Sequence, residues 1–431
     1  MLLTAQMPKS ATVIGAGLAG LSTAVYLAEE GLKVTVIEAN SEVGLESSFM
    51  NGALVVPSLT QPWCNPNNIK MFIKDTFGGS LPGRYESDDK SVDILWGKVA
   101  RDVEFWKWLM NFAYFSLFPG EFYRIYKLSY ELSRYSQDCL ENLLPKHQLS
   151  TSRGTIQLYS TERERQAQFD VLRRVVGDVK VLQPAEVMQL EPVFRNPALF
   201  PGGALHSALD TSMDVHALCL ALKEKAMQLG VRFAMNTNLL PGDLTLGPTE
   251  TETETGDEVN GASGGKRIEE IVVTTAGTQN GSASSMPIGT DVYVVCTGNH
   301  SNLFSDAFGD SWHSWPVRGL AMEVPLLPDA TPLVHNVVDD VRRNYIAPVG
   351  TDRVRLSGYV EIGERLPVNS QSVSFDRDKT SLHILKQARS LLPPNYLVSF
   401  DPKSGDTDVT LGVKTHACYR PQTADDLPVI G

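Results

Sequence analysis

The sequence of 431 residues is poor in the features that mark several special classes of protein. No apolar run reaches the roughly 20 residues that a membrane-spanning helix needs, because Glu104, Lys107 and Asn111 interrupt the most aromatic stretch. The five cysteines form no Cys-x-x-Cys pair, which argues against a disulfide framework and against a thiolate zinc site. Residues 1–10 contain no apolar core of the length that a secretory signal has. These absences predict a cytoplasmic protein.

Positive charge is also scarce, with 38 lysine and arginine residues against 50 aspartate and glutamate residues and a net charge of −12. Such a chain is poorly suited to bind the phosphates of nucleic acid, so we expect no nucleic-acid partner. No two of the eight histidines stand at the spacing of metal ligands, and there is no Gly-x-Ser-x-Gly motif. The sequence therefore predicts neither a metal site nor a serine nucleophile.

The first forty residues contain a clear alternation of strand and helix signals. The apolar run at 11–14 predicts a strand, residues 21–30 have the pattern of a helix, and residues 33–37 predict a second strand. A strand, a helix and a strand of this length require a right-handed crossover between parallel strands. The pattern therefore predicts the start of a doubly wound, dinucleotide-binding sheet.

The turn between the first strand and the helix carries the motif Gly15-Ala16-Gly17-Leu18-Ala19-Gly20. Here Gly15 permits the tight turn, Gly17 lets the backbone approach a pyrophosphate, and Gly20 lets helix and strand pack closely. The unpaired N–H groups at the start of the helix would face the phosphates. Glu38 closes the second strand, where its carboxylate can accept hydrogen bonds from both ribose hydroxyls. This arrangement is suited to FAD or to NAD.

The segment after Glu38 helps to choose between the two dinucleotides. Residues 42–52 are small, polar and glycine-bearing, which suits a chain that wraps a diphosphate and passes over a flavin. Together with the glycine motif, this segment resembles the FAD-dependent D-amino-acid oxidase superfamily, and most closely the D-amino-acid dehydrogenase small-subunit family. The resemblance covers nearly the whole chain and reappears, in order, at 135–140, 154–158, 317–319, 344–358, 419–421 and 428–431.

The resemblance implies an α/β fold with two domains built from separated pieces of chain. One is an FAD-binding, Rossmann-like domain of the glutathione-reductase type, and the other is an α+β substrate domain on an antiparallel sheet. The expected ranges are 1–65, 201–312 and 405–431 for the FAD domain, and 66–200 and 313–404 for the substrate domain.

Three further segments can be interpreted from their residues alone. Strand patterns at 344–349 and 353–360 flank a short turn-rich loop and predict an antiparallel hairpin. The polar segment 241–266 has too few apolar side chains to offset its ordering entropy, so we expect a mobile insertion. Residues 103–128 contain ten aromatic side chains, which predict the core of the second domain, with a membrane-docking or acyl-lining surface as the alternative.

The resemblance also implies which residues hold FAD. Beyond the glycine motif and Glu38, they are Ala39, Ser47, Ser48, Asn51, Gly52, Thr297 and Gly298. Residues 291–298 look like a flavin-domain strand that ends in small residues, although an ordinary buried strand and turn explains them equally well. Residues 231–235 look like the strand whose backbone lies beside the adenine.

Flavin amine oxidation moves a hydride from the substrate α-carbon to flavin N5, so the protein must hold the substrate carboxylate and amine in place. Arginine is the natural clamp for a carboxylate, because two parallel N–H bonds fix both distance and plane. The candidates are Arg318, Arg342, Arg343 and Arg420, with Tyr345 as a hydroxyl donor. Arg420 and Tyr345 are favoured, followed by Arg318, because their segments resemble the substrate-facing part of the family. For each arginine, a solvated surface role is the alternative.

The leading prediction is therefore an FAD enzyme that oxidises an amino acid, with D-amino acids favoured, to an imino acid that water hydrolyses to a 2-oxo acid and ammonia. The alternatives are oxidation of a secondary amine, such as a glycine derivative or proline, and a flavoprotein-like module without catalysis. The last alternative comes from two departures from the family pattern. The sequence ends at Gly431, before an expected strand and helix, and Asp426 stands where the pattern favours glycine. Oxygen and a quinone are both open as electron acceptors, and a quinone would fit a peripheral membrane contact.

Overall fold

The chain folds into two compact units in a computed structural model. The residues that the structure describes are 8–66, 68–69, 92–143, 152–248, 266–275, 284–308, 314–339, 344–365, 377–399 and 412–429. Unit 1 combines Met1–Phe49, Val215–Trp312 and Leu366–Ser370, and unit 2 combines Met50–Asp214, His313–Arg365 and Gln371–Gly431. The assignment of a flavin domain and a substrate domain to particular ranges stays a prediction, because compactness does not show what a unit binds.

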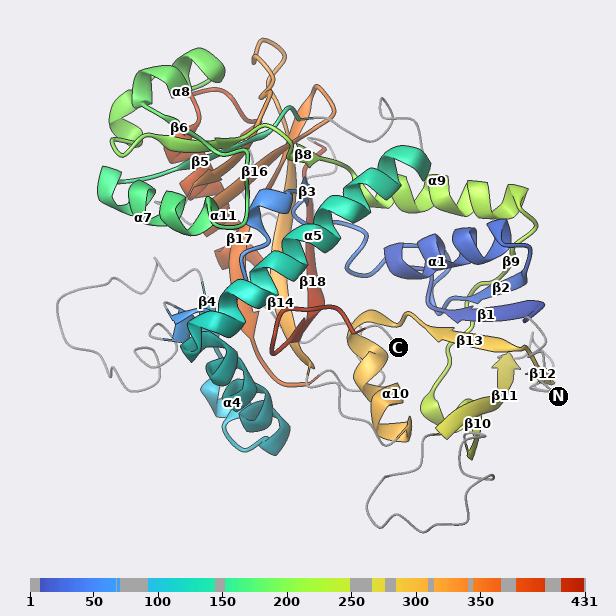
Figure 1. Cartoon of the computed structure of the whole chain (residues 1–431). Helices are drawn as coiled ribbons and strands as arrows, with labels where there is room; N and C mark the ends of the chain where they lie inside the picture. The colour runs from blue at the N-terminus through green and yellow to red at the C-terminus, as the bar shows by residue number, and fades with distance from the viewer. Residues whose placement is uncertain are drawn as a thin grey trace. The chain divides into compact units, whose positions relative to one another are not determined.

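Unit 1 is built on a parallel sheet with the strand order β13-β1-β2-β9 (Figure 1). Its elements are β1 (Ser10–Ile14), α1 (Leu18–Glu29), β2 (Lys33–Ile37), α9 (Val215–Gln228), β9 (Arg232–Ala234) and β13 (Val292–Val295). The predicted strand, helix and parallel strand at the start of the chain are confirmed, and α1 packs beside α9. Four consecutive residues of β1, Ala11 to Ile14, are buried, so both faces of this strand are covered, as expected in a parallel sheet.

A second, antiparallel sheet in unit 1 contains β10 (Leu244–Pro248), β11 (Lys266–Thr275) and β12 (Ser284–Ile288). The 3-10 turn at Pro241–Asp243 leads into β10. The first residues of the segment expected to be a mobile insertion are thus paired with β11, and 249–265 lie outside the described residues. After β13, a 3-10 turn at Gly298–His300 leads into α10 (Ser301–Phe308).

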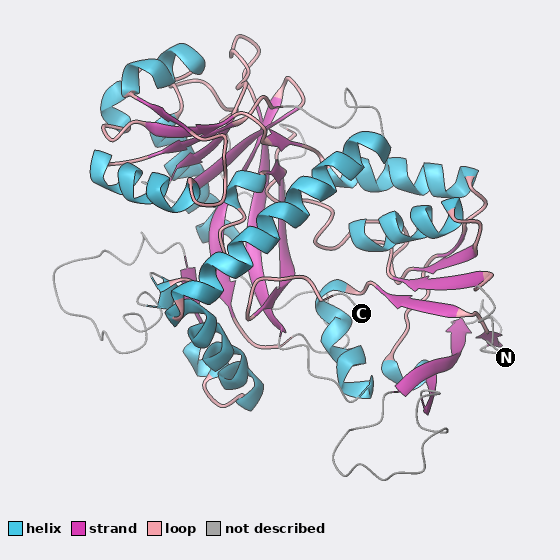
Figure 2. Ribbon diagram, in the orientation of Figure 1, coloured by secondary structure: helices cyan, strands magenta, loops and turns pink. Residues whose placement is uncertain are grey.

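Unit 2 is built on one large sheet, with nine strands among the described residues (Figure 2). Eight strands follow the order β18-β14-β17-β16-β15-β5-β7-β6, and β4 pairs with β17. The strands are β4 (Val92–Ile94), β5 (Thr155–Leu158), β6 (Lys180–Leu182), β7 (Ala204–Ser207), β14 (Ser314–Pro325), β15 (Asn336–Asp339), β16 (Asn344–Val349), β17 (Arg353–Ile362) and β18 (Lys414–Thr423). Most pairs are antiparallel, and the predicted hairpin is confirmed as β16 and β17. Two short strands, β3 (Leu54–Val55) and β8 (Thr211–Ser212), pair separately.

The helices of unit 2 include the long aromatic-rich stretch. They are α3 (Trp96–Val99), α4 (Val103–Leu117), α5 (Pro119–Leu143), α7 (Glu162–Leu172), α8 (Pro184–Leu190) and α11 (Arg377–Leu391), with 3-10 turns at Pro57–Leu59 and Pro197–Leu199. α4 begins after Asp102, whose carboxylate accepts hydrogen bonds from the N–H groups of Glu104 (2.9 Å) and Phe105 (3.3 Å). No helix in the part of the chain that the structure describes is long and apolar enough to cross a membrane.

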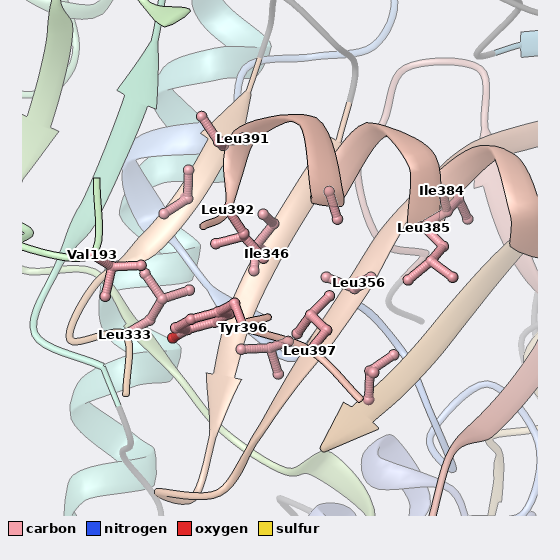
Figure 3. Packing of buried hydrophobic residues seen from close by; sticks show 14 of the residues in the cluster. Val193, Leu333, Ile346, Leu356, Ile384, Leu385, Leu391, Leu392, Tyr396 and Leu397 are labelled. Atoms are coloured by element: carbon pink, nitrogen blue, oxygen red, sulfur yellow. The ribbon is translucent and has the colours of Figure 1, made fainter. Parts of the chain in front are cut away.

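The core of unit 2 lies on both faces of the large sheet. On one face, Ile384, Leu385 and Leu391 of α11 pack against Ile346 and Leu356 of the hairpin (Figure 3). On the other face, aromatic side chains of α4 pack with the first residues of β14, and this cluster contains Phe105, Trp108, Phe112, Trp315 and Val317. The inner side of α4 is therefore part of the core, and burial of each such aromatic side chain stabilises the fold by about 3–5 kcal/mol relative to alanine.

Candidate functional site

The glycine turn between β1 and α1 is closely packed at two of its three glycines. Gly15 has φ +101°, and a Cβ there would lie 2.4 Å from the carbonyl oxygen of Cys296, the residue that follows β13. A Cβ on Gly20 would lie 1.9 Å from the carbonyl oxygen of Gly15. Neither position has room for a side chain, so both glycines are required by the contact of turn, helix and neighbouring strand.

Gly17 is different, because the protein itself leaves room beside it. It is the N-cap of α1 with extended backbone angles, and a Cβ there would meet only the hydroxyl of Ser48, at 3.5 Å. Having no side chain, it cannot cap the first N–H groups of the helix. The N–H of Leu18 is donated to Ser48 Oγ (3.2 Å), and the first turn of α1 contains no acidic residue. The positive end of this helix is therefore suited to receive an anion such as a diphosphate.

Glu38, which directly follows β2, forms a hydrogen bond with the glycine turn. Its side chain is buried, with Oε2 accepting a hydrogen bond from the N–H of Ala16 (2.7 Å) and Oε1 accepting two from Asn40 (2.8 and 2.9 Å). Each carboxylate oxygen can accept two hydrogen bonds, so Oε2 retains capacity for one ribose hydroxyl. Sequence reasoning did not find the Ala16 contact, which holds the carboxylate beside the turn. Ala39, the next predicted residue, is exposed.

The segment that follows Glu38 is anchored within unit 1 by contacts to α9. Glu42 forms an ion pair with Lys223 (2.6 Å), and this hydrogen bond lowers the pKa of the Glu42 carboxyl. Gly44 has φ +68°, and a Cβ there would lie 3.0 Å from Cys219 Cβ. These contacts hold the loop that carries Ser47 and Ser48 next to the start of α1. Two predicted FAD residues, Asn51 and Gly52, fall in unit 2 instead.

Thr297 and Gly298 follow β13, which is the direct neighbour of β1 in the parallel sheet. The Thr297 hydroxyl contacts that of Ser301 at 3.1 Å, and Gly298 has φ +56° with open space where a Cβ would be. The carboxyl ends of β1 and β13 are at the same edge of the sheet, where ligands of open α/β sheets bind. The glycine turn, Glu38, Ser48 and Thr297 of unit 1 thus provide what a dinucleotide needs: the positive end of a helix, a buried acceptor and room beside Gly17.

In unit 2, the register of the sheet places the predicted substrate residues on two different faces. We define the α11 face as the face of the sheet that carries Leu320 and Leu356, which belong to the same core cluster as the buried side chains of α11. Arg318 lies on the α11 face, two residues before Leu320 on β14. Arg420 is paired with Val317 and lies on the opposite face.

Tyr345 lies on the same face as Arg420. It is paired with Ser357, which is itself paired with Ala321, four residues after Val317 on β14. Its side chain is 37 % exposed, and Arg420 is exposed as well. The structure thus brings Arg420 and Tyr345 to one face of the sheet. Arg342 and Arg343 lie outside the described residues.

Arg318 is buried in a polar row across three strands, with 3 % of its surface exposed. It pairs in register with Glu361 of β17 and Tyr419 of β18. One guanidinium nitrogen forms an ion pair with Glu361, and another donates to the Tyr419 hydroxyl (3.3 Å). Burial raises the pKa of the Glu361 carboxyl, and the Arg318 charge opposes that rise. The charge of Arg318 is thus already matched by Glu361, a partner that sequence reasoning missed.

Arg420 has surroundings that leave its charge accessible. Its guanidinium lies 5.5 Å from the centre of the Trp63 ring and donates to the side-chain oxygen of Gln422. Neither partner is anionic, so the positive charge is not neutralised by a direct ion pair with either. An exposed, oriented arginine of this kind can bind a carboxylate through two parallel N–H bonds.

Known proteins resemble this chain in sequence and in fold. The family model described as FAD dependent oxidoreductase (DAO) matches residues 10–431. A D-amino acid dehydrogenase from Rhodopseudomonas palustris (strain HaA2) is 27 % identical over 438 residues, covering 97 % of this chain and 85 % of the relative. Glycine oxidase from Geobacillus kaustophilus shares the fold with TM-score 0.59, 17 % identity and coverage of 98 % and 85 % of the two chains. L-proline dehydrogenase from P. horikoshii does so with TM-score 0.56, 16 % identity and coverage of 98 % and 84 %.

The two solved structures show the fold alone at these identities. Together with the family match, they confirm the expected α/β fold with a Rossmann-like FAD domain and a substrate domain. The family match covers the glycine turn, the hairpin and β18 in one continuous span. Because this match runs over nearly the whole sequence, the chain belongs to the FAD dependent oxidoreductase family and is an enzyme whose cofactor is FAD.

Proposed function

We propose that the protein oxidises an amino acid, with D-amino acids as the first choice, to an imino acid that water hydrolyses to a 2-oxo acid and ammonia. The observation that carries the proposal is the exposed Arg420 on the same sheet face as Tyr345. The relative at 27 % identity, a D-amino acid dehydrogenase, supports the choice of substrate class. FAD, when bound, accepts the two electrons and the hydrogen from the substrate α-carbon.

In this proposal, some residues of the chain bind the cofactor and others bind the substrate. The N–H groups at the start of α1 and the Glu38 carboxylate hold the phosphates and the adenosine ribose of the cofactor. Arg420 binds the substrate carboxylate, and the Tyr345 hydroxyl donates a further hydrogen bond to the substrate. No side chain needs to act as a general base if the substrate amine binds in its neutral form.

A second substrate class follows from the fold relatives. Glycine oxidase and L-proline dehydrogenase share the fold, so a secondary amine such as a glycine derivative or proline is the alternative substrate. Such a molecule also has a carboxylate that Arg420 can bind. The two classes differ in the group attached to the amine nitrogen, which the arginine does not contact.

Rapid mixing of the FAD-loaded enzyme with a panel of amines separates the two classes. We expect D-amino acids to bleach the oxidised flavin spectrum at least tenfold faster than the L-enantiomers, sarcosine or proline. Faster bleaching by sarcosine or proline would replace the first choice by the alternative. The same reaction under air and under nitrogen with a soluble quinone then identifies the electron acceptor, because only oxygen yields hydrogen peroxide.

We also propose that the outer side of α4 contacts a membrane surface. Val103, Trp106, Met110, Tyr114 and Leu117 are three or four residues apart, so they form one stripe along the helix, the α4 stripe. Each is at least 40 % exposed, and Met110 is 71 % exposed. Tryptophan and tyrosine are the aromatic residues favoured at the boundary between lipid and water. A membrane contact would bring the enzyme close to a lipid-soluble quinone.

Sedimentation with lipid vesicles tests the α4 stripe. We expect the protein to sediment with vesicles of phosphatidylcholine and phosphatidylglycerol, and the double variant Met110→Glu, Leu117→Glu to lose at least fivefold of this binding. Met227→Glu is the matched control, because Met227 on α9 is 58 % exposed and outside the stripe. A parent protein that stays in the supernatant would contradict the proposal.

A further inference from the structure

The turn that follows β18 contains an aspartate in a backbone conformation that favours glycine. Asp426 has φ +62°, in the left-handed region that most side chains avoid. Aspartate is tolerated there better than most residues, but glycine adopts this conformation freely. An acidic side chain at this position therefore needs a compensating role, and its contacts show what that role is.

The Asp426 carboxylate joins two segments that are far apart in sequence. One oxygen accepts a hydrogen bond from the main-chain N–H of Trp63, and the other accepts one from the side-chain amide nitrogen of Gln422. Gln422 is 3 % exposed, and the indole N–H of Trp108 donates to its main-chain oxygen (2.8 Å). Both ends of the carboxylate are thus used, and Gln422 is fixed by its backbone as well as by its side chain.

These contacts determine which end of the Gln422 amide faces Arg420. A carboxylate only accepts hydrogen bonds, so it takes the NH₂ end of the amide and leaves the oxygen end pointing away. That oxygen accepts a hydrogen bond from the Arg420 guanidinium. Arg420 therefore donates a hydrogen bond to Gln422, and Gln422 donates one to Asp426.

The second support of Arg420 also depends on Asp426. The guanidinium lies 5.5 Å from the centre of the Trp63 ring, and the main-chain N–H of Trp63 is the other donor to the Asp426 carboxylate. The Trp63 ring is packed edge-on against Phe112 at 6.2 Å between ring centres. One carboxylate therefore holds both the acceptor and the aromatic face that orient the arginine.

We infer that Asp426 and Gln422 are positioning residues that hold the Arg420 guanidinium in place for the substrate carboxylate. The inference rests on the proposed function in assigning the carboxylate to Arg420. A long arginine side chain loses rotational freedom when it binds a ligand, so an arginine that is already held binds more tightly. Neither positioning residue has to touch the substrate.

Two substitutions of Asp426 separate the effect of its side-chain hydrogen bonds from the effect of its backbone conformation. Asp426→Gly relaxes the backbone and removes both acceptors, whereas Asp426→Asn tolerates the same φ and leaves one acceptor for two donors. With the FAD-loaded full chain, we expect both variants to raise KM for the best amino-acid substrate about tenfold and to change kcat less than twofold. Turnover of the corresponding amine without a carboxylate should not change.

Equilibrium binding gives a readout that does not need turnover. The probe for calorimetry is the carboxylic acid that has the side chain of the best substrate and a hydrogen in place of its amino group. Its Kd should be about tenfold higher in both variants. Asp425→Asn is the matched control, because Asp425 lies in the same turn and its side chain accepts a hydrogen bond from the N–H of Leu427 (3.2 Å). Its Kd should stay within twofold of the parent.

A double-mutant cycle shows whether Asp426 acts through Arg420. In the Arg420→Met background, Asp426→Asn should have no further effect on the Kd of the carboxylic acid. An equal tenfold loss in that background would overturn the inference. If the Asp426 variants fail to fold, Gln422→Met, which removes both the donor and the acceptor, tests the same prediction. A parent enzyme that binds the carboxylic acid but oxidises no amino acid would contradict the proposed function and leave the cycle valid.

Discussion

Replacing Gly17 with valine is expected to give a folded protein that no longer takes up FAD. A Cβ at Gly17 meets no atom closer than the Ser48 hydroxyl at 3.5 Å, and the backbone angles there are open to any residue. The Cβ atom of a new side chain therefore fits the protein, and valine occupies the space in which a diphosphate would approach the start of α1. Loss of two charge-assisted hydrogen bonds weakens binding by about 100-fold or more.

Two neighbouring glycines supply the comparison. Gly20→Ala places a methyl group 1.9 Å from the Gly15 carbonyl oxygen, so this variant should lose stability as well as FAD. Gly31→Ala has open space around the new methyl group and only the cost of its φ of +87°, roughly 1 kcal/mol. The flavin absorbance after dialysis against FAD, together with the melting temperature of the apoprotein, distinguishes the three. A Gly17→Val protein with the parent's yellow colour would show that the diphosphate binds elsewhere.

The elements at the start of the chain could be predicted from sequence because their signals are local. Apolar alternation and short glycine-rich turns identified β1, β2 and the hairpin of β16 and β17. The helix was predicted from residue 21, whereas α1 begins at Leu18. The difference arises because Leu18, Ala19 and Gly20 belong to the glycine motif. Gly20 is a weak helix former, so the sequence of the first turn does not indicate a helix.

The faces of the two arginines could not be predicted, because they depend on pairing between distant strands. Both arginines follow an apolar or aromatic neighbour, in Val317-Arg318 and Tyr419-Arg420, so the local patterns are alike. The register of β14 against β18 sets Arg318 beside Tyr419 and Arg420 beside Val317. A shift by one residue would exchange the faces, and nothing in either segment alone fixes it.

The partners that decide the chemistry of these arginines are equally distant. Arg318 and Glu361 are 43 residues apart, and Trp63 and Asp426 are 363 residues apart. Sequence reasoning found the residue types that bind a carboxylate but gave no sign of which arginine was already neutralised. That information appears only when the three strands β18, β14 and β17 are placed side by side.

The two arginines therefore predict opposite phenotypes when each is replaced by methionine. Arg420→Met removes an exposed charge whose contacts are Gln422 and Trp63, so stability should change by less than about 1 kcal/mol. Binding of a substrate carboxylate should weaken about 100-fold, because a bidentate, charge-assisted contact is lost. KM for the amino acid and the melting temperature of the holoenzyme measure the two effects.

Arg318→Met should instead destabilise the fold, because it leaves the buried Glu361 carboxylate without its ion-pair partner. Breaking a buried ion pair from one side costs about 3–5 kcal/mol. Burial already raises the pKa of Glu361, and loss of the arginine removes the charge that opposes this rise. A carboxyl with a raised pKa in the folded state stabilises it below the unfolded pKa and loses this contribution as pH rises through the folded pKa. The variant should therefore be closest to the parent in acid and fall behind it as pH rises.

Restoring the charge balance distinguishes a structural arginine from a substrate-binding one. Adding Glu361→Gln to Arg318→Met removes the unpaired charge, so the double variant should recover most of the lost stability and lose the pH dependence. No substitution at Glu361 should rescue Arg420→Met, because Glu361 lies on the α11 face and Arg420 on the other. If Arg318→Met raised KM as much as Arg420→Met while melting like the parent, Arg318 would be the clamp, and the assignment of the substrate to the opposite face would be wrong.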